Sequence, residues 1–116
     1  MSSIDPNCVF CKIVSGQIPS KKAFEDEELL AFHDIHPSAP VHVLIIPKLH
    51  IATLSDAGPE HDPLLGRMMG LAPRLMQQLG VTDGFRIVVN TGPDGGQEVY
   101  HLHMHVMGGP RPWAKG

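Results

Sequence analysis

The sequence has no long apolar run, no cluster of basic residues and only two cysteines among its 116 residues. A membrane-spanning helix needs about 20 consecutive apolar residues, so we expect no membrane partner. Sequence-independent binding of nucleic acid needs several clustered Lys or Arg side chains. The formal charge of -3 and the absence of a basic run argue against such binding. The N-terminus lacks the charged and apolar regions of a signal peptide, which predicts a cytoplasmic protein.

The length of the chain is typical of one domain, which we predict to span residues 1–116. A domain of this size has a single core, and an oligomer interface would help it to bury apolar surface. We therefore expect a compact unit that pairs with a second copy.

Cys8 and Cys11 have the C-x-x-C spacing, which can form a redox pair, supply half of a zinc site, or be two reduced thiols. The motif opens the chain instead of following the first strand of a βαβ unit, and this placement disfavours a thioredoxin-like role. Half of a zinc site would require two further ligands from elsewhere in the chain.

Three histidines stand at alternate positions, as His101, His103 and His105. Alternate residues of a strand share one face and lie about 6.6 Å apart, so we predict a row of imidazoles on a strand. An apolar row would lie behind it, formed by Tyr100, Leu102, Met104 and Val106. Imidazole offers proton transfer, a nucleophilic nitrogen and metal ligation, and the row alone leaves metal binding and metal-free chemistry equally open. Glycines at 95–96 and 108–109 let a ligand approach the backbone, which favours a ligand pocket.

The remaining pattern predicts an α+β fold with an antiparallel sheet, because one long helix interrupts an otherwise continuous series of strands. Pro73 removes an amide donor and should kink or split that helix, unless surrounding packing absorbs the cost. Asn7 is the expected cap of a short first helix that ends at Ser15. The expected strands and long helix are a hairpin at 23–25 and 29–34, a central strand at 41–46, the helix at 62–79, and a strand at 85–90.

Residues 101–107, His-Leu-His-Met-His-Val-Met, resemble the His-φ-His-φ-His-φ-φ signature of the histidine triad (HIT) superfamily, in which φ is apolar. Segments 32–35, 45–50, 88–92 and 95–100 also resemble its nucleotide-binding branch, in the same order along nearly the whole chain. The resemblance implies a HIT-like fold with about five antiparallel strands, one long helix and a short N-terminal helix. It also implies a homodimer whose two sheets join edge to edge.

The resemblance implies hydrolysis of purine nucleoside 5′-phosphoramidates, of adenosine or guanosine, without a catalytic metal. His103 would attack the α-phosphorus in line and form a nucleotidyl-histidine, which water resolves to the nucleoside monophosphate. His105 resembles the group that contacts the phosphate, and Gln97 and Asn90 would orient phosphate oxygens. His42 would steady the nucleophile from the neighbouring strand.

Nucleotide recognition is likewise implied by the resemblance. Asp34 resembles the carboxylate that accepts hydrogen bonds from both ribose hydroxyls, and a carboxylate between apolar residues needs a polar partner. The expected surroundings of the purine are Phe10, Ile13, Phe32, His33 and Ile35. For the apolar members, simple core packing is a strong alternative, because such side chains are usually buried.

The resemblance also supplies companions for the two cysteines, because C-x-x-C members of the superfamily bind zinc with two histidines that match His50 and His101. Two thiolates and two imidazoles would complete a closed, structural zinc site. His101 has an alternative, metal-free role as a hydrogen-bonded support of the site.

Two other functions are alternatives to the phosphoramidase hypothesis. One is a dinucleoside polyphosphate hydrolase of the same superfamily, and the other is a nucleotide-binding regulatory or scaffold protein. Glu98 stands where eukaryotic relatives commonly have a small hydroxyl residue, and a carboxylate there would favour basic amine leaving groups.

Overall fold

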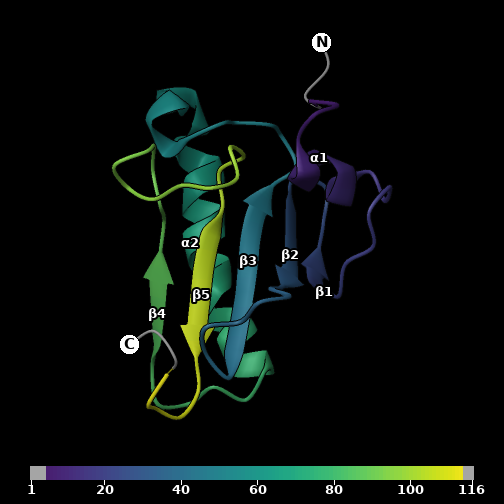
Figure 1. Ribbon diagram of the computed structural model, residues 1–116. Helices are drawn as coiled ribbons and strands as arrows, with labels where there is room; N and C mark the ends of the chain where they lie inside the picture. The colour runs from purple at the N-terminus through teal and green to yellow at the C-terminus, as the bar shows by residue number, and fades with distance from the viewer. Residues whose placement is uncertain (1–4, 114–116) are drawn as a thin grey trace.

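Five antiparallel strands form one sheet in the order β1-β2-β3-β5-β4 (Figure 1). The computed structural model describes residues 5–113. Residues 1–4, which are part of the segment judged to lack signal-peptide features, lie outside the described residues. The strands are β1 (Lys22–Glu25), β2 (Leu29–His33), β3 (Val41–Pro47), β4 (Phe85–Val88) and β5 (Met104–Gly108), and the helices are α1 (Val9–Val14) and α2 (Asp62–Gln78). The predicted α+β fold with its central third strand is confirmed. Within residues 5–113 no helix is long and apolar enough to cross a membrane.

The two faces of the sheet are covered by different helices. Alternate residues of a strand point to opposite faces, and β3 shows this directly, because Val43 and Ile45 pack with α2 whereas Leu44 and Ile46 pack with α1. Both faces of β3 are therefore buried, which explains its continuous apolar run.

Helix α2 continues through Pro73, so this residue does not split the helix and the cost of its missing amide donor is absorbed. Pro73 is exposed, and the carbonyl that loses its partner belongs to Met69, whose side chain is 52% exposed. Water can satisfy a carbonyl on that face. Met69 is correspondingly not part of the core, although it fits the apolar spacing. The helix ends before Gly80, which has a φ of +81°, as expected for a C-terminal stop.

Helix α1 is capped by Cys8 and not by Asn7. The Cys8 Sγ accepts a hydrogen bond from the Cys11 amide at 3.3 Å, and the Asn7 amide instead donates to Asp5 Oδ1. Cys8 takes the cap position because its side chain is buried against the sheet.

The histidine strand is shorter than predicted, because β5 begins only at Met104. Before it, the Leu102 amide donates to the Ile51 carbonyl at 2.7 Å, outside the sheet. The alternation nevertheless persists, since Leu102, Met104 and Val106 join the core under α2. Tyr100 is 44% exposed and does not belong to that apolar row.

Candidate functional site

The imidazoles of β3 and the histidine segment converge on the face of the sheet that carries α1. The His103 and His105 rings lie 5.0 Å apart between centroids, and His42 Nε2 lies 2.9 Å from His105 Nδ1. Phe10 of α1 places its ring edge-on to His103, with centroids 5.1 Å apart. The sheet register explains the pairing, because His42 is opposite Met107 and His105 is therefore its diagonal neighbour. His42, predicted to steady the nucleophile, thus makes its contact with His105.

His103 has one ring nitrogen committed to the backbone. Its Nδ1 lies 2.8 Å from the His101 carbonyl oxygen, and because a carbonyl can only accept, Nδ1 carries the proton. In a neutral imidazole the lone pair then belongs to Nε2. Burial lowers the pKa of His103, which keeps the ring uncharged and Nε2 nucleophilic near neutral pH.

The neighbouring imidazoles are also held in the uncharged form. Burial lowers the pKa of His105 to about 4. His103 and His42 lower this pKa further, whereas the Asp34 carboxylate raises it. Burial likewise lowers the pKa of His42, again against the pull of Asp34. At neutral pH the cluster therefore offers lone pairs and N–H donors and carries no positive charge.

Asp34 follows β2 and faces these imidazoles. Its Oδ1 accepts a hydrogen bond from the His36 amide at 2.8 Å, and its Oδ2 lies 3.5 Å from His42 Nε2. The side chain is 19% exposed, so Oδ2 retains acceptor capacity for a further ligand.

The apolar residues expected around a purine divide into two groups. Phe10, Ile13 and Phe32 pack in one buried cluster on the α1 face, with the Phe10 and Phe32 rings 5.5 Å apart. Ile35, by contrast, is 85% exposed and lies beyond the end of β2. His33 is half-buried at the strand end, and burial lowers its pKa, with Lys21 adding to the effect.

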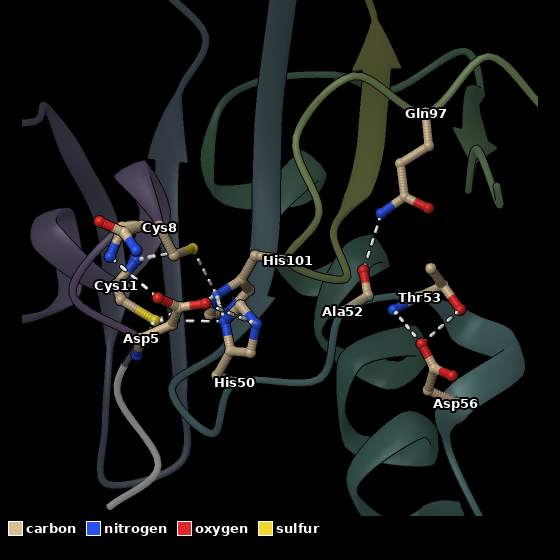
Figure 2. A network of polar contacts seen from close by, with 10 residues as sticks. Asp5, Cys8, Cys11, His50, Ala52, Thr53, Asp56, Gln97 and His101 are labelled. Atoms are coloured by element: carbon tan, nitrogen blue, oxygen red, sulfur yellow. Dashed lines mark hydrogen bonds and ion pairs between the residues drawn. The ribbon is translucent and has the colours of Figure 1, made fainter. Parts of the chain in front are cut away.

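Gln97 and Asn90 hold the glycine-rich turn between β4 and the histidine segment. The buried Gln97 amide donates to the Ala52 carbonyl at 2.8 Å (Figure 2). It also donates to the Val99 carbonyl at 3.0 Å, and its oxygen accepts from the Gly92 amide. Asn90 donates to the Gly95 carbonyl at 2.8 Å. Both side chains, predicted to orient phosphate, are thus engaged in shaping the loop beside the histidines.

Cys8, Cys11, His50 and His101 come together at the base of α1, and their ligand atoms all lie within 4.8 Å of one another (Figure 2). His50 Nδ1 lies 3.2 Å from His101 Nδ1, and three of the four nitrogen to sulfur distances are 3.3, 3.3 and 3.6 Å. Tetrahedral zinc, with bonds of about 2.0–2.1 Å to nitrogen and about 2.3 Å to sulfur, separates its ligand atoms by about 3.3–3.8 Å. The four residues fit such an ion in type, number and spacing.

The groups around this cluster orient its ligand atoms. His101 Nε2 lies 2.7 Å from the Pro47 carbonyl, so Nε2 carries the proton and the Nδ1 lone pair points into the cluster. The Asp5 amide donates to Cys11 Sγ at 3.4 Å, and Asp5 Oδ2 lies 3.9 Å from His50 Nε2. Burial is the main reason that the pKa of Cys11 is raised, so a metal would displace a proton there.

One peptide unit connects this cluster to the His103 imidazole. The carbonyl of the peptide between His101 and Leu102 accepts from His103 Nδ1, and its N–H donates to the Ile51 carbonyl. His101 and His50, whose neighbour is Ile51, both belong to the cluster. The backbone that orients His103 is therefore fixed by the cluster from two sides.

Comparison with known proteins decides the family. The model of the HIT domain matches residues 15–111. This chain belongs to the HIT family. It is 53% identical to Protein HitA of Neisseria gonorrhoeae, over 90% of this chain and 97% of that protein. It is 47% identical to the purine nucleoside phosphoramidase of Escherichia coli K12, over 87% of this chain and 86% of that protein. The crystal structure of a HIT family hydrolase from Legionella pneumophila Philadelphia 1 matches with a TM-score of 0.88 and 48% identity, over 95% and 100% of the two chains.

Membership of the HIT family confirms the resemblance seen in the sequence, and with it the expected sheet and helices. Two participants in the site were missed from the sequence. The Asp5 side chain carries a weak signal, since it precedes the C-x-x-C motif. The Ser38 amide, which donates to His42 Nδ1 at 2.9 Å, carries none, because every residue except proline has the same group.

Proposed function

We propose that this HIT protein hydrolyses purine nucleoside 5′-phosphoramidates in two displacements at His103. The observation that carries the proposal is the hydrogen bond from His103 Nδ1 to the His101 carbonyl, which leaves the Nε2 lone pair for attack on phosphorus. The 47% identity to an E. coli protein named purine nucleoside phosphoramidase supports the substrate class.

In the first displacement, Nε2 forms a bond to the α-phosphorus, and the bond from phosphorus to nitrogen breaks as the amine leaves with an added proton. In the second, water attacks the phosphorus and releases the nucleoside monophosphate from His103. An uncharged nucleophile suits this reaction, because a protonated imidazole has no lone pair to donate.

Nucleotide binding is proposed at the same face. Asp34 Oδ2 keeps acceptor capacity for ribose hydroxyls, and Phe10 and Phe32 offer aromatic surface next to His103. The exposed Ile35 would cover a base that enters from solvent, since an apolar side chain in that position gains from contact with a ring.

We also propose one structural zinc ion, held by the four residues of the cluster described above. Such an ion cross-links α1 to the loop after β3 and to the histidine segment, and it stabilises the fold. The chain itself performs the proposed reaction, since His103 is the nucleophile and lies outside the four ligands.

A homodimer is proposed with β4 as the joining edge. β1 and β4 are the outer strands of the sheet over residues 5–113. β1 carries a register irregularity and the charged pair Lys22 and Glu25, which are features that protect a sheet edge. β4 instead exposes 40% of Phe85. Light scattering on the purified protein should give twice the mass of the chain, and Phe85→Lys should reduce it to that of a monomer.

The substrate proposal is tested by comparing turnover of an adenosine 5′-phosphoramidate with turnover of a diadenosine polyphosphate. We expect kcat/KM for the phosphoramidate to be higher by about two orders of magnitude or more, a difference of about 2.7 kcal/mol in barrier. Preferential cleavage of the dinucleotide would assign the chain to the other activity of the superfamily.

A further inference from the structure

The loop between β2 and β3 determines which nitrogen of His42 carries a proton. The Ser38 amide lies 2.9 Å from His42 Nδ1 and can only donate. Nδ1 therefore accepts and carries no proton. A neutral imidazole has a single N–H, so the proton of His42 is on Nε2. His42 is only 6% exposed, so water does not compete freely with the Ser38 amide for Nδ1.

The proton on His42 then determines the tautomer of His105. His42 Nε2 has two acceptors within reach, His105 Nδ1 at 2.9 Å and Asp34 Oδ2 at 3.5 Å. The shorter contact is the hydrogen bond, since donor to acceptor distances beyond about 3.2 Å are weak for N–H donors. His105 Nδ1 accepts it, and the only proton of His105 is therefore on Nε2.

We propose that the Ser38 amide, acting through His42, holds His105 as an uncharged imidazole whose Nε2–H donates to the phosphoryl oxygen that gains charge during nucleotidyl transfer. This inference rests on the proposed function and deepens it. Ser38 and His42 are positioning residues, and His105 is the group that contacts the phosphate. A fixed neutral donor aimed at developing negative charge needs no rearrangement during the reaction.

The same chain of hydrogen bonds makes His105 a poor acid. If Nε2 gave up its proton, His105 could recover one at Nδ1 only from His42, and the Ser38 amide cannot replace the proton that His42 would lose. One ring would be left as an imidazolate. His105 therefore keeps its proton through both displacements, and the proton that the departing amine gains does not come from this ring.

The hydrogen bonds also argue against a metal at these residues. The ligand atoms of Asp34, His42 and His105 lie within 4.8 Å of one another, as they would around a cation. A metal on His42 Nε2 would replace its proton while Nδ1 is also unprotonated. A neutral imidazole ligand needs a proton on its other nitrogen, and the Ser38 amide prevents this.

Nitrogen-15 NMR of histidine-labelled protein at pH 7, free and with adenosine monophosphate bound, tests the inference directly. We expect His42 and His105 each to show a protonated Nε2 and an unprotonated Nδ1. A protonated Nδ1 on either ring, or a doubly protonated ring, would overturn the proposal. This measurement uses the unaltered protein and does not depend on the folding of a variant.

Two pairs of variants provide the kinetic test. Ser38→Pro removes the amide proton and Ser38→Ala retains it. Full loss of an oxyanion donor costs about 100-fold or more in kcat, and a mixture of tautomers keeps part of the donor, so we expect kcat of S38P to be about fivefold below that of S38A. KM should agree within about twofold, because the donor acts in the transition state. Equal kcat values in the two folded variants would contradict the proposal.

The second pair of variants changes His42, which connects the Ser38 amide to His105. His42→Gln keeps an N–H donor near the Nε2 position, whereas His42→Leu removes it, so H42Q should have a kcat about tenfold above that of H42L. Equal loss in both variants would show that His42 acts only by packing. Absence of phosphoramidate turnover in the unaltered protein would refute the proposed function, whereas a wrong tautomer in an active enzyme would refute this inference alone.

Discussion

Substitution of Asp34 by Asn tests how the site recognises ribose. In the structure Oδ1 already accepts the His36 amide, and Oδ2 lies near His42 Nε2, which carries a proton. Asn can keep the first contact, but its NH2 group would then face His42 and the ribose hydroxyls as a donor. Loss of a charged acceptor costs about 1.5–3 kcal/mol. Binding of adenosine monophosphate should therefore weaken by roughly 10- to 100-fold.

Isothermal titration with adenosine monophosphate and its 2′-deoxy analogue, against both proteins, measures the effect. The deoxy ligand has already lost one hydroxyl partner, so it should lose much less affinity on mutation. Asp83→Asn is the matched control, because it makes the same charge change at an exposed residue before β4, two strands away from β3. Equal weakening of both ligands by D34N would refute the reasoning and give Asp34 a structural role.

Three further outcomes are expected. His103→Ala should lower phosphoramidate turnover by about three orders of magnitude or more while nucleotide binding persists, and near-normal turnover measured by release of the amine would exclude His103 as the nucleophile. Elemental analysis of protein purified without chelator should find one zinc per chain. Cys8→Ser and Cys11→Ser should each lower the zinc content and the Tm without abolishing catalysis. Unaltered protein that contains no zinc would refute the proposed zinc site. Arg67 lowers the pKa of Asp26 to about 2. The stability gained from this pair is therefore present above the ordinary Asp pKa of about 3.9 and is lost as pH falls through about 2. The loss of Tm caused by Arg67→Ala at pH 7 should shrink in that window, and a loss of Tm that does not depend on pH would contradict a stabilising ion pair between Arg67 and Asp26.

The parts of the fold that the sequence predicts well are those set by local periodicity. The apolar run of β3 reflects a strand that is buried on both faces, and the helical spacing of α2 reflects one buried face. Both elements lie within a residue or so of the predicted bounds. Pro73 shows the limit of local rules, because its cost depends on which face of the helix turns to solvent. Met69 fits the apolar spacing and is exposed for the same reason.

The errors in the histidine segment have a long-range origin. Strand β5 starts at Met104, because the preceding residues are held by Ile51 and by the cluster of cysteines and histidines. Alternation of residue types cannot show such contacts, since they join residues that are 51 to 93 positions apart. The cluster was accessible through the resemblance to relatives, whereas the Ser38 amide was not, because main-chain groups leave no mark on the sequence.

The central claim is that His103 becomes covalently attached to the nucleotide during turnover. Rapid quenching of the enzyme with an adenosine phosphoramidate, followed by mass spectrometry of its peptides, tests this claim most directly. We expect an adenylate adduct on the peptide that contains His103, absent from His103→Ala and formed no more slowly than the steady-state turnover. Turnover without any such adduct, or an adduct on another residue that persists in His103→Ala, would contradict it.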